Sequence, residues 1–297
     1  MSVGICAYNE ERDIGRLLER LLNQKTDIVD IREIIVVSSG STDRTDEIVK
    51  AFSKRDSRVK LVTQPRRMGK ASAVNEFLKR ASGDICVLES ADTIPAQDAV
   101  EKLCRPFLDP RVGMTGGRPI PLNDGGTFIG FVGRLLWWLH HRISVRNPKL
   151  GELIAFRRVI SSIPEDVVVD ECYIEAVIKG MSYELKYVPD AIVYNMAPRS
   201  ISDFLKQRRR IHAGYIQLKK KLGYTPSTLD VSATMREVLR GIALKPSRLP
   251  WFLGAIALEL LARILGVYDY YSGKKHHVWE VVPSTKDLGA AARGVVD

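Results

Sequence analysis

A short acidic stretch, Glu89-Ser-Ala-Asp92, follows the strand-like run 84–88. Acidic side chains at the carboxyl end of a buried strand are suited to hold Mg²⁺ or Mn²⁺, which prefer oxygen ligands. Two carboxylates spaced one residue apart would need an acid at position 90, where this chain has Ser90. Glu89 would point to the opposite face of a continuing strand and is a poor replacement. The stretch is therefore either a metal site with one carboxylate or a polar turn.

The elements that must position this stretch follow from the hydrophobic pattern. Apolar runs alternate with segments of helical periodicity through the first half of the chain. We expect strands at 3–8, 33–37, 59–63 and 84–88, and helices that begin at Asn9, surround 48–52, and cover 71–81 and 95–107. This alternation predicts an α/β fold with a mixed, mostly parallel sheet and helices on both faces.

Four polar loops follow the predicted strands. They lie at 7–10, at 38–43, around Lys70 and at 89–93. In open α/β sheets, ligands bind in the crevice outside the carboxyl ends of the strands, so these loops should meet. Their amides, hydroxyls, acids and single lysine suit a nucleotide diphosphate and a metal ion.

The charge of the chain favours an anionic partner. The 297 residues carry a net charge of +10 and are 45% hydrophobic, which indicates a folded, basic protein. Nucleic acid, a phosphorylated substrate and an anionic membrane surface are all compatible with that charge, as is a merely soluble basic surface. No Cys-x-x-Cys spacing occurs among the four cysteines, so a zinc site is not expected.

The loops resemble the ordered motifs of glycosyltransferase family 2, the inverting enzymes of GT-A fold. The matching motifs are AYNEE (7–11), IIVVSSGSTDRT (34–45), GKASAVN (69–75) and DICVLESADT (84–93). The resemblance covers about residues 3–95, and weaker features continue to about 215. It implies a GT-A, Rossmann-like catalytic domain over 1–200, with a nucleotide-sugar half at 1–117 and an acceptor half at 118–200.

The resemblance implies a nucleoside-diphosphate sugar donor and assigns residues to it. Ser38 and Ser39 stand where the family usually has two aspartates, and Lys70 is a candidate for a phosphate or the base edge, or is only a solvated lysine. Ser90 and Asp92 align with the family's Asp-x-Asp motif, in which the second aspartate often binds Mg²⁺ or Mn²⁺ directly. The residues that would border the base and ribose are Ala7, Tyr8, Asn9 and Glu10.

A second acidic pair lies where family members carry the general base. Inversion requires the acceptor hydroxyl to lose a proton as it attacks the anomeric carbon. By this resemblance Asp170 is the favoured base and Glu171 the second choice. The alternative is that both acids only stabilise the start of a helix. An essential base would indicate a hydroxyl acceptor, because an ionised phosphate acceptor would not need one.

A basic segment at 203–215 resembles the Gln-x-x-Arg-Trp element of cellulose-synthase-like enzymes. Gln207, Arg208 and Arg210 match, and such arginines can clamp a pyrophosphate. Ile211 replaces the tryptophan, which argues against processive polysaccharide synthesis. The alternative is a basic face on a surface helix.

The segment 249–271 is the longest apolar stretch, and Glu259 and Arg263 are its only charges between Trp251 and Tyr268. Both flanks are basic, whereas a single span should show charge asymmetry, so an inserted or interfacial helix is favoured. Buried helices of a soluble protein are the alternative. We expect amphipathic interfacial helices at 128–142 and 201–248, an inserted segment at 249–272 and a tail at 273–297.

These observations predict a membrane-associated, metal-dependent, inverting glycosyltransferase whose catalytic domain faces the cytoplasm. GDP-mannose is the favoured donor by analogy and a UDP-sugar the alternative, and the acceptor is a polyprenyl-linked saccharide. Rival functions are a polyprenyl-phosphate glycosyltransferase and a polysaccharide synthase using a UDP-sugar. A non-enzymatic basic module for membrane or nucleic acid is more distant, because it would not need Asp92 and Asp170 in strand-end loops. We expect no nucleic-acid partner.

Overall fold

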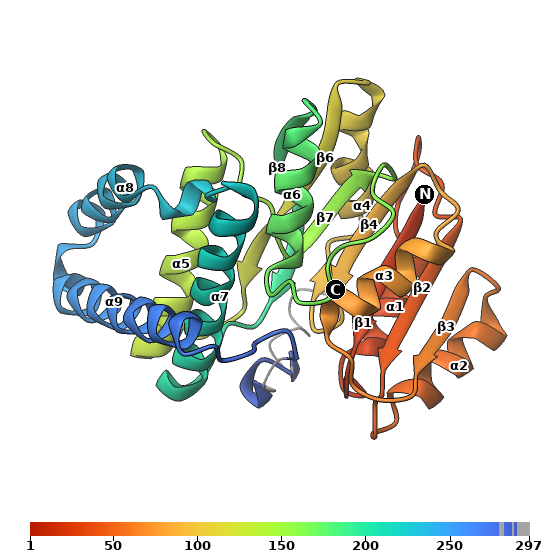
Figure 1. Cartoon of the computed structure of the whole chain (residues 1–297), viewed down its shortest axis with the longest axis horizontal. Coiled ribbons are helices and arrows are strands. Elements are labelled where there is room, and N and C mark those ends of the chain that lie inside the picture. Colours follow the sequence, from red (N-terminus) through yellow and green to blue (C-terminus); the bar gives the residue numbers. More distant parts are fainter. Residues whose placement is uncertain (279–281, 287, 290–297) are drawn as a thin grey trace.

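The computed structural model describes residues 1–278, 282–286 and 288–289, so part of the tail expected at 273–297 lies outside the described residues. An eight-stranded sheet crosses the molecule in the order β3-β2-β1-β4-β7-β6-β8-β5 (Figure 1). Strands β3, β2, β1 and β4 are parallel, and β7 runs antiparallel to β4 and β6. The sheet is thus mixed and mostly parallel, as predicted. Its strands are β1 (Ser2–Ala7), β2 (Glu33–Ser39), β3 (Val59–Gln64), β4 (Ile85–Ser90), β5 (Ile94–Pro95), β6 (Val112–Pro121), β7 (Leu153–Arg157) and β8 (Glu184–Asn195).

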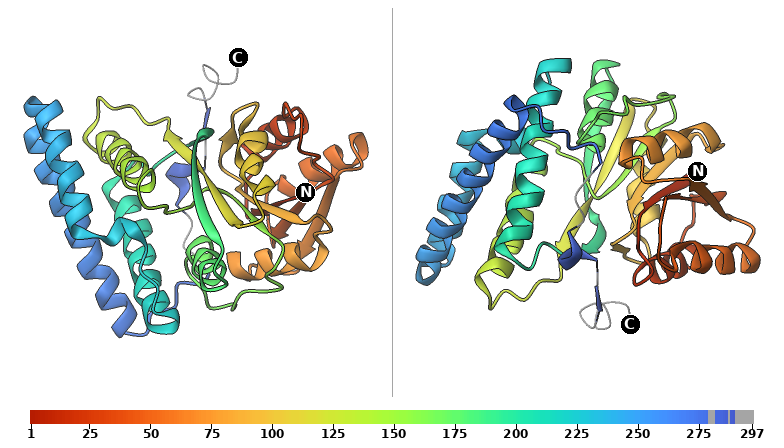
Figure 2. Two further views of the ribbon diagram at one scale, coloured as in Figure 1. Left: turned by 90° about the horizontal axis from the view of Figure 1, so that it is seen from above. Right: turned by 60° about the horizontal axis from the view of Figure 1, so that its bottom comes forward.

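Helices cover both faces of this sheet and then form a separate layer (Figure 1, Figure 2). The helices of the α/β part are α1 (Ile14–Leu22), α2 (Thr45–Arg55), α3 (Lys70–Arg80), α4 (Ala99–Cys104) and α6 (Asp170–Gly180). The helices of the second layer are α5 (Phe128–Ser144), α7 (Ile201–Leu222), α8 (Val231–Leu244) and α9 (Leu249–Tyr271). Because α5 packs with α8 and α9, the expected catalytic domain at 1–200 contributes a helix to this layer.

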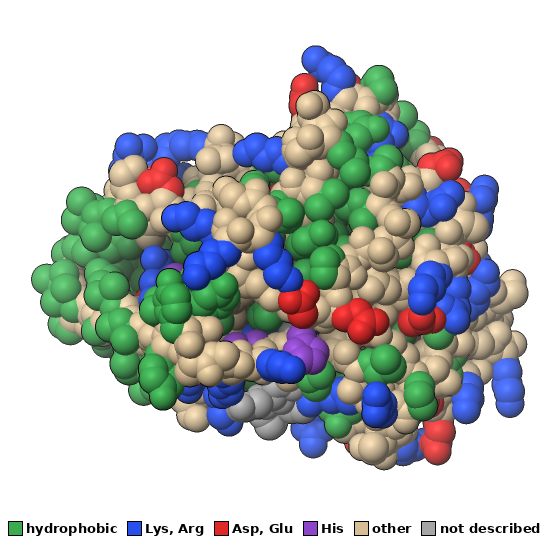
Figure 3. Space-filling model, viewed as in Figure 1, with side chains coloured by type: hydrophobic (Ala, Val, Ile, Leu, Met, Phe, Trp, Pro, Cys, Tyr) green, Lys and Arg blue, Asp and Glu red, His purple; other side chains and the backbone are tan. Residues whose placement is uncertain are grey.

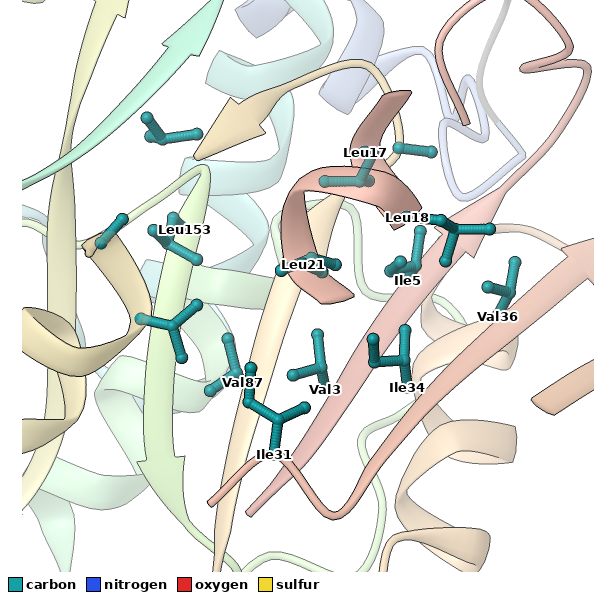
Figure 4. Close-up of a cluster of buried hydrophobic side chains, with 14 of the residues drawn as sticks. Val3, Ile5, Leu17, Leu18, Leu21, Ile31, Ile34, Val36, Val87 and Leu153 are labelled. Carbon is teal, nitrogen blue, oxygen red and sulfur yellow. The ribbon is translucent and has the colours of Figure 1, made fainter. Parts of the chain in front are cut away.

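The core explains why the strand ends are held rigidly. On one face, the leucines of α1 pack over Val3 and Ile5 of β1 and their neighbours in β2 and β4 (Figure 4). On the other face, Phe77 of α3 lies directly against Gly4, where an added Cβ would come within 2.6 Å of the Phe77 ring. Because α3 follows directly after β3, its first residue, Lys70, lies near the carboxyl edge of the sheet.

Two expected helix starts are wrong. The first helix begins at Ile14 rather than at Asn9, because Asn9 has a left-handed φ of 54°. Its side-chain carbonyl accepts from the backbone N–H of Thr42 at 2.8 Å, which fixes a turn between two strand-end loops. The helix expected at 95–107 begins at Ala99, because Ile94–Pro95 pairs with β8 instead.

Helix α9 presents its charged residues to α7. Glu259 is held by two nitrogens of Arg208 at 2.8 and 2.9 Å and pairs with Arg263 at 2.9 Å, while Asp269 pairs with Arg209. By length and apolar character alone, Pro246–Tyr271 could cross a membrane. Helix α9 differs from an isolated transmembrane helix, because one of its sides packs against the basic helix α7.

Candidate active site

A cavity of about 560 Å³ begins at the carboxyl ends of β1, β2 and β4 and continues between the helices of the second layer. Its first part is lined by charged and hydroxyl side chains of the strand-end loops. Its second part is apolar and is lined by residues such as Leu136 and Leu139 of α5, Met235 and Val238 of α8, and Ile256 and Leu260 of α9. A polar chamber and a hydrocarbon-like channel are therefore continuous.

Most of the residues expected at the site line this cavity, and three do not. Asn9 is engaged with Thr42, and Ser38 is buried with its hydroxyl bonded to Ser41 at 2.9 Å. Asp170 is only 2% exposed and lies outside the lining. The expected residues that do line the cavity are Ala7, Tyr8, Glu10, Ser39, Lys70, Ser90, Asp92, Glu171, Gln207, Arg208 and Arg210.

The polar chamber contains carboxylates that repel one another. Burial raises the pKa of Asp92, and burial together with the charge of Asp92 raises the pKa of Glu10 to about 8. Glu10 Oε2 has no hydrogen-bond partner in the described chain. Oxygen atoms with excess negative charge fit Mg²⁺ or Mn²⁺, which take one or two carboxylates and complete the sphere with phosphate and water. Glu89 is buried, does not line the cavity and accepts a hydrogen bond from the Thr93 hydroxyl.

No cluster of three metal-ligating side chains occurs among the residues that the structure describes. Asp92 alone supplies too few ligands for a cation. A cation beside Asp92 would need further oxygen atoms from a bound ligand. The stretch 89–92 thus presents one carboxylate, Asp92, to the cavity, and the metal site there stays a prediction.

A second acid–base group lies across the cavity. Lys70 Nζ is 3.1 Å from Asp170 Oδ2 and donates a hydrogen bond to Glu171 Oε1. Burial and the charge of Glu171 raise the pKa of Asp170 to about 6. Burial acts against ionisation of Glu171 too, but Lys70 lowers the pKa of Glu171 to about 2. The two carboxyl groups titrate as a unit, so the pair loses its last proton near pH 6.

The two arginines expected to clamp a pyrophosphate differ in their surroundings. Arg208 is committed to Glu259 of α9 through two hydrogen bonds, so it cannot hold a phosphate without weakening that pair. Arg210 lies within the field of Glu171 and Asp170, and burial lowers the pKa of its guanidinium to about 10. Arg210 is therefore the better placed of the two cations beside the acceptor carboxylates.

Three residues that sequence reasoning missed also line the chamber. The Arg67 guanidinium lies 4.2 Å above the centre of the Tyr8 ring, and the basic loop before Lys70 is a signal that could have indicated it. Glu152 has a left-handed φ of 62°, and burial and the charge of Asp92 raise its pKa to about 7. Lys286 Nζ donates to the Tyr8 carbonyl and the Glu10 carboxylate. Nothing in the local pattern around residue 286 predicts this contact with the first strand.

Comparisons with known proteins show which proteins this chain resembles. The family model described as "Glycosyl transferase family 2" matches residues 2–161. Poly-beta-1,6-N-acetyl-D-glucosamine synthase of Staphylococcus aureus (strain COL) is 26% identical over 277 residues, which cover 89% of this chain and 61% of the synthase. The Staphylococcus epidermidis synthase is 26% identical over 222 residues, covering 69% of this chain and 52% of that protein. The chain thus spans less than two thirds of these relatives.

Two solved structures share the fold. Mannosyltransferase PcManGT from Pyrobaculum calidifontis, in complex with GDP-Man and Mn²⁺, superposes with a TM-score of 0.65 at 22% identity. The match covers 92% of this chain and 87% of that one. Glucosyl-3-phosphoglycerate synthase from Mycobacterium tuberculosis, in complex with Mn²⁺ and UDP-Glc, superposes with a TM-score of 0.52 at 24% identity, covering 76% of this chain and 80% of that one.

Proposed function

Because the chain belongs to glycosyl transferase family 2, we propose that it moves a sugar from a nucleoside-diphosphate donor to a lipid-linked saccharide at a membrane. The observation that carries this proposal is the continuity of the cavity from the charged chamber to the apolar channel. A donor diphosphate suits the chamber, and the hydrocarbon chain of an acceptor suits the channel. A polysaccharide would find few polar partners between α5, α8 and α9.

Asp92 would hold Mg²⁺ or Mn²⁺ against the donor diphosphate, and such an ion supplies charge neutralisation of the leaving group. Glu171 faces the cavity and accepts the proton of the acceptor hydroxyl. Asp170, behind it, is a positioning residue that shares the charge of Lys70 with Glu171. Tyr8, Ser39 and Arg67 border the nucleoside. The cavity lining thus changes the order of preference between the two acids.

Donor and acceptor can be tested together. The purified protein is incubated with Mn²⁺, membrane lipid extract and, in separate reactions, GDP-mannose and a set of UDP-sugars. We expect a glycolipid from GDP-mannose, our first choice, or from one UDP-sugar, and none after EDTA treatment. A long water-soluble polymer from a UDP-sugar would favour the synthase alternative, and the absence of transfer from all donors would refute the proposal.

Ser90 offers a prediction about the strength of metal binding. Ser90→Asp adds a second carboxylate beside Asp92, and affinity for hard cations rises with the number of charged ligands. We expect the Mn²⁺ concentration for half-maximal activity to fall about three- to tenfold, with activity retained. Titration of activity with Mn²⁺ measures this, and Ser57→Asp, in the exposed turn before β3, serves as the control. Loss of activity in a folded Ser90→Asp protein would assign Ser90 an unidentified role.

The second layer exposes an apolar face that supports association with a membrane surface. Hydrophobic side chains gather over α8 and α9 in Figure 3. Leu253 and Ile264 of α9 are 57% and 67% exposed, although α9 packs on α7 through its charged side. Exposed Arg236, Arg240 and Lys245 adjoin this face, which suits the anionic lipids of a cytoplasmic leaflet. We therefore propose that α8 and α9 lie in the membrane interface.

Charges placed on this face should release the protein from membranes. The double variant Leu253→Glu/Ile264→Glu should bind vesicles containing anionic lipid at least about tenfold more weakly, because each charge must enter the interface. Co-sedimentation with vesicles measures the change. Leu108→Glu is the matched control, because Leu108 is 76% exposed and lies outside this layer. Equal binding of both variants would contradict the interfacial placement.

A further inference from the structure

A buried lysine lies on the cavity wall without a carboxylate partner. Lys149 is 8% exposed, and its ammonium donates to the backbone carbonyl of Leu150. Within the described chain no ion pair joins it to an acid, although Glu175 and Glu171 are near enough to raise its pKa. The nearby acids balance this charge only through space, so the ammonium keeps N–H donors that no described carboxylate accepts and that a ligand oxygen could complete.

A buried histidine faces the same space. His140 of α5 lines the cavity and is 8% exposed, and no described side chain hydrogen-bonds to either ring nitrogen. Burial and the charge of Lys149 lower the pKa of His140 to about 3, and the Lys149 backbone offsets this only in part. The ring is therefore neutral at physiological pH and offers one N–H donor to a ligand.

These two residues lie where the chamber meets the channel. Lys149 precedes by three residues Glu152, which lies within the field of Asp92 and Glu171. His140 belongs to the face of α5 that carries Leu136 and Leu139 into the apolar channel. Both residues line the cavity that also contains Glu171 and the apolar channel.

We propose that Lys149 and His140 bind the phosphate that joins the sugar of the acceptor to its hydrocarbon chain. This inference rests on the proposed lipid-linked acceptor. It adds that the site selects an acceptor whose sugar and hydrocarbon chain are joined by a phosphate. An ammonium and an imidazole N–H supply donors and one positive charge, as an anionic phosphate requires. With the phosphate here and the chain in the channel, the saccharide extends to Glu171, where its hydroxyl is the nucleophile. A polyprenyl phosphate that is itself the nucleophile would instead have to place its phosphate beside Glu171.

Binding of two lipids of the same chain length tests the charge. Farnesyl phosphate and farnesol are titrated into the detergent-solubilised protein, and tryptophan fluorescence reports binding alongside calorimetry. Trp137 contributes to this signal, and its ring centroid lies 5.3 Å from that of His140. We expect farnesyl phosphate to bind the wild type about tenfold or more tightly than farnesol. Lys149→Met should abolish that preference, and His140→Phe should reduce it about threefold.

The outcomes separate the phosphate site from the proposed function. Equal affinity of both lipids for the wild type, or an undiminished preference in Lys149→Met, would overturn the phosphate site while leaving the channel intact. Binding of neither lipid would overturn both proposals. Binding of glucuronic acid that depends on Lys149, with no preference for farnesyl phosphate, would assign the charge to an acidic sugar and overturn the inference.

Folding is monitored independently. Lys149→Met should lower the melting temperature, because it leaves the buried Glu175 without the nearby positive charge that favours its ionised form. Lys102→Met provides the matched control, since Lys102 is paired with Asp98 on the surface of α4. This control should keep the full preference for farnesyl phosphate, and its loss there would show that the assay does not report the site.

Discussion

Asp92→Asn should lower the rate of sugar transfer by about a thousandfold or more. Removing the carboxylate that would hold the cation leaves the developing charge of the diphosphate without several kcal/mol of stabilisation. Asparagine keeps the size of the side chain, so the effect measures charge rather than packing. The quantity to compare is kcat/KM for the donor at saturating Mn²⁺, together with binding of Mn²⁺ in the presence of a nucleoside diphosphate.

The melting temperature of metal-free Asp92→Asn should rise above that of the metal-free wild type, although the activity of the variant falls. Glu10 binds its proton more tightly in the folded state, because burial and the charge of Asp92 raise its pKa to about 8. Its contribution to stability therefore falls as pH rises from the unfolded value of about 4.3 toward 8. Asp92→Asn removes part of this repulsion and should raise the melting temperature at pH 8. Asp98→Asn on the surface is the control, and full activity of Asp92→Asn or activity insensitive to EDTA would refute the metal assignment.

Glu171→Gln should reduce transfer to a hydroxyl acceptor by about 10²- to 10⁴-fold, the range for loss of a general base. The wild-type rate should fall as pH drops below about 6, because Asp170 takes up a proton there and Lys70 is then left to pair with Glu171 alone. The sign follows from the role, since a base is weaker when a neighbouring cation stabilises its ionised form. Measurement of kcat/KM for the acceptor between pH 4.5 and pH 8 tests this, with limits chosen to bracket the transition.

The variant Asp170→Asn tests whether Asp170 positions the base or is itself the residue that accepts the proton. It removes the like charge but leaves Lys70 beside Glu171, so the acid limb of the profile should shift below pH 6 while most activity remains. Glu165→Gln, in the exposed loop before α6, is the control for the loss of an acid. If Glu171→Gln retains activity within about twofold and Asp170→Asn does not, Asp170 is the base.

The site residues that short-range sequence patterns place at the ends of strands and helices could be predicted. Asp92 lies at the end of β4 and Lys70 at the start of α3 because apolar runs and helical periodicity are short-range signals. The family resemblance assigns both Ser38 and Ser39 to the donor. Successive strand residues point to opposite faces, however, and only Ser39 lines the cavity. The alternation in β2 was thus a usable signal that was missed.

The other half depends on contacts between distant segments. Asn9 has the preferences of a helix cap, but its bond to Thr42 across 33 residues decides its conformation. Lys70 meets Glu171 across 101 residues, which requires the packing of α6 beside α3. Lys149 and His140 fall together only because α5 and the loop before β7 border one cavity. The hydrophobic pattern of one segment cannot predict contacts between segments that are distant in the sequence.

The pairing of α9 with α7 has a consequence for how the protein is made. Ribosomes release α7 before α9, so the guanidinium groups of Arg208 and Arg209 are already present when Glu259 and Asp269 emerge. The basic partners of both acids are therefore in place before α9 is complete. The order of the two helices along the chain favours docking of these 23 residues on α7 as soon as they are synthesised.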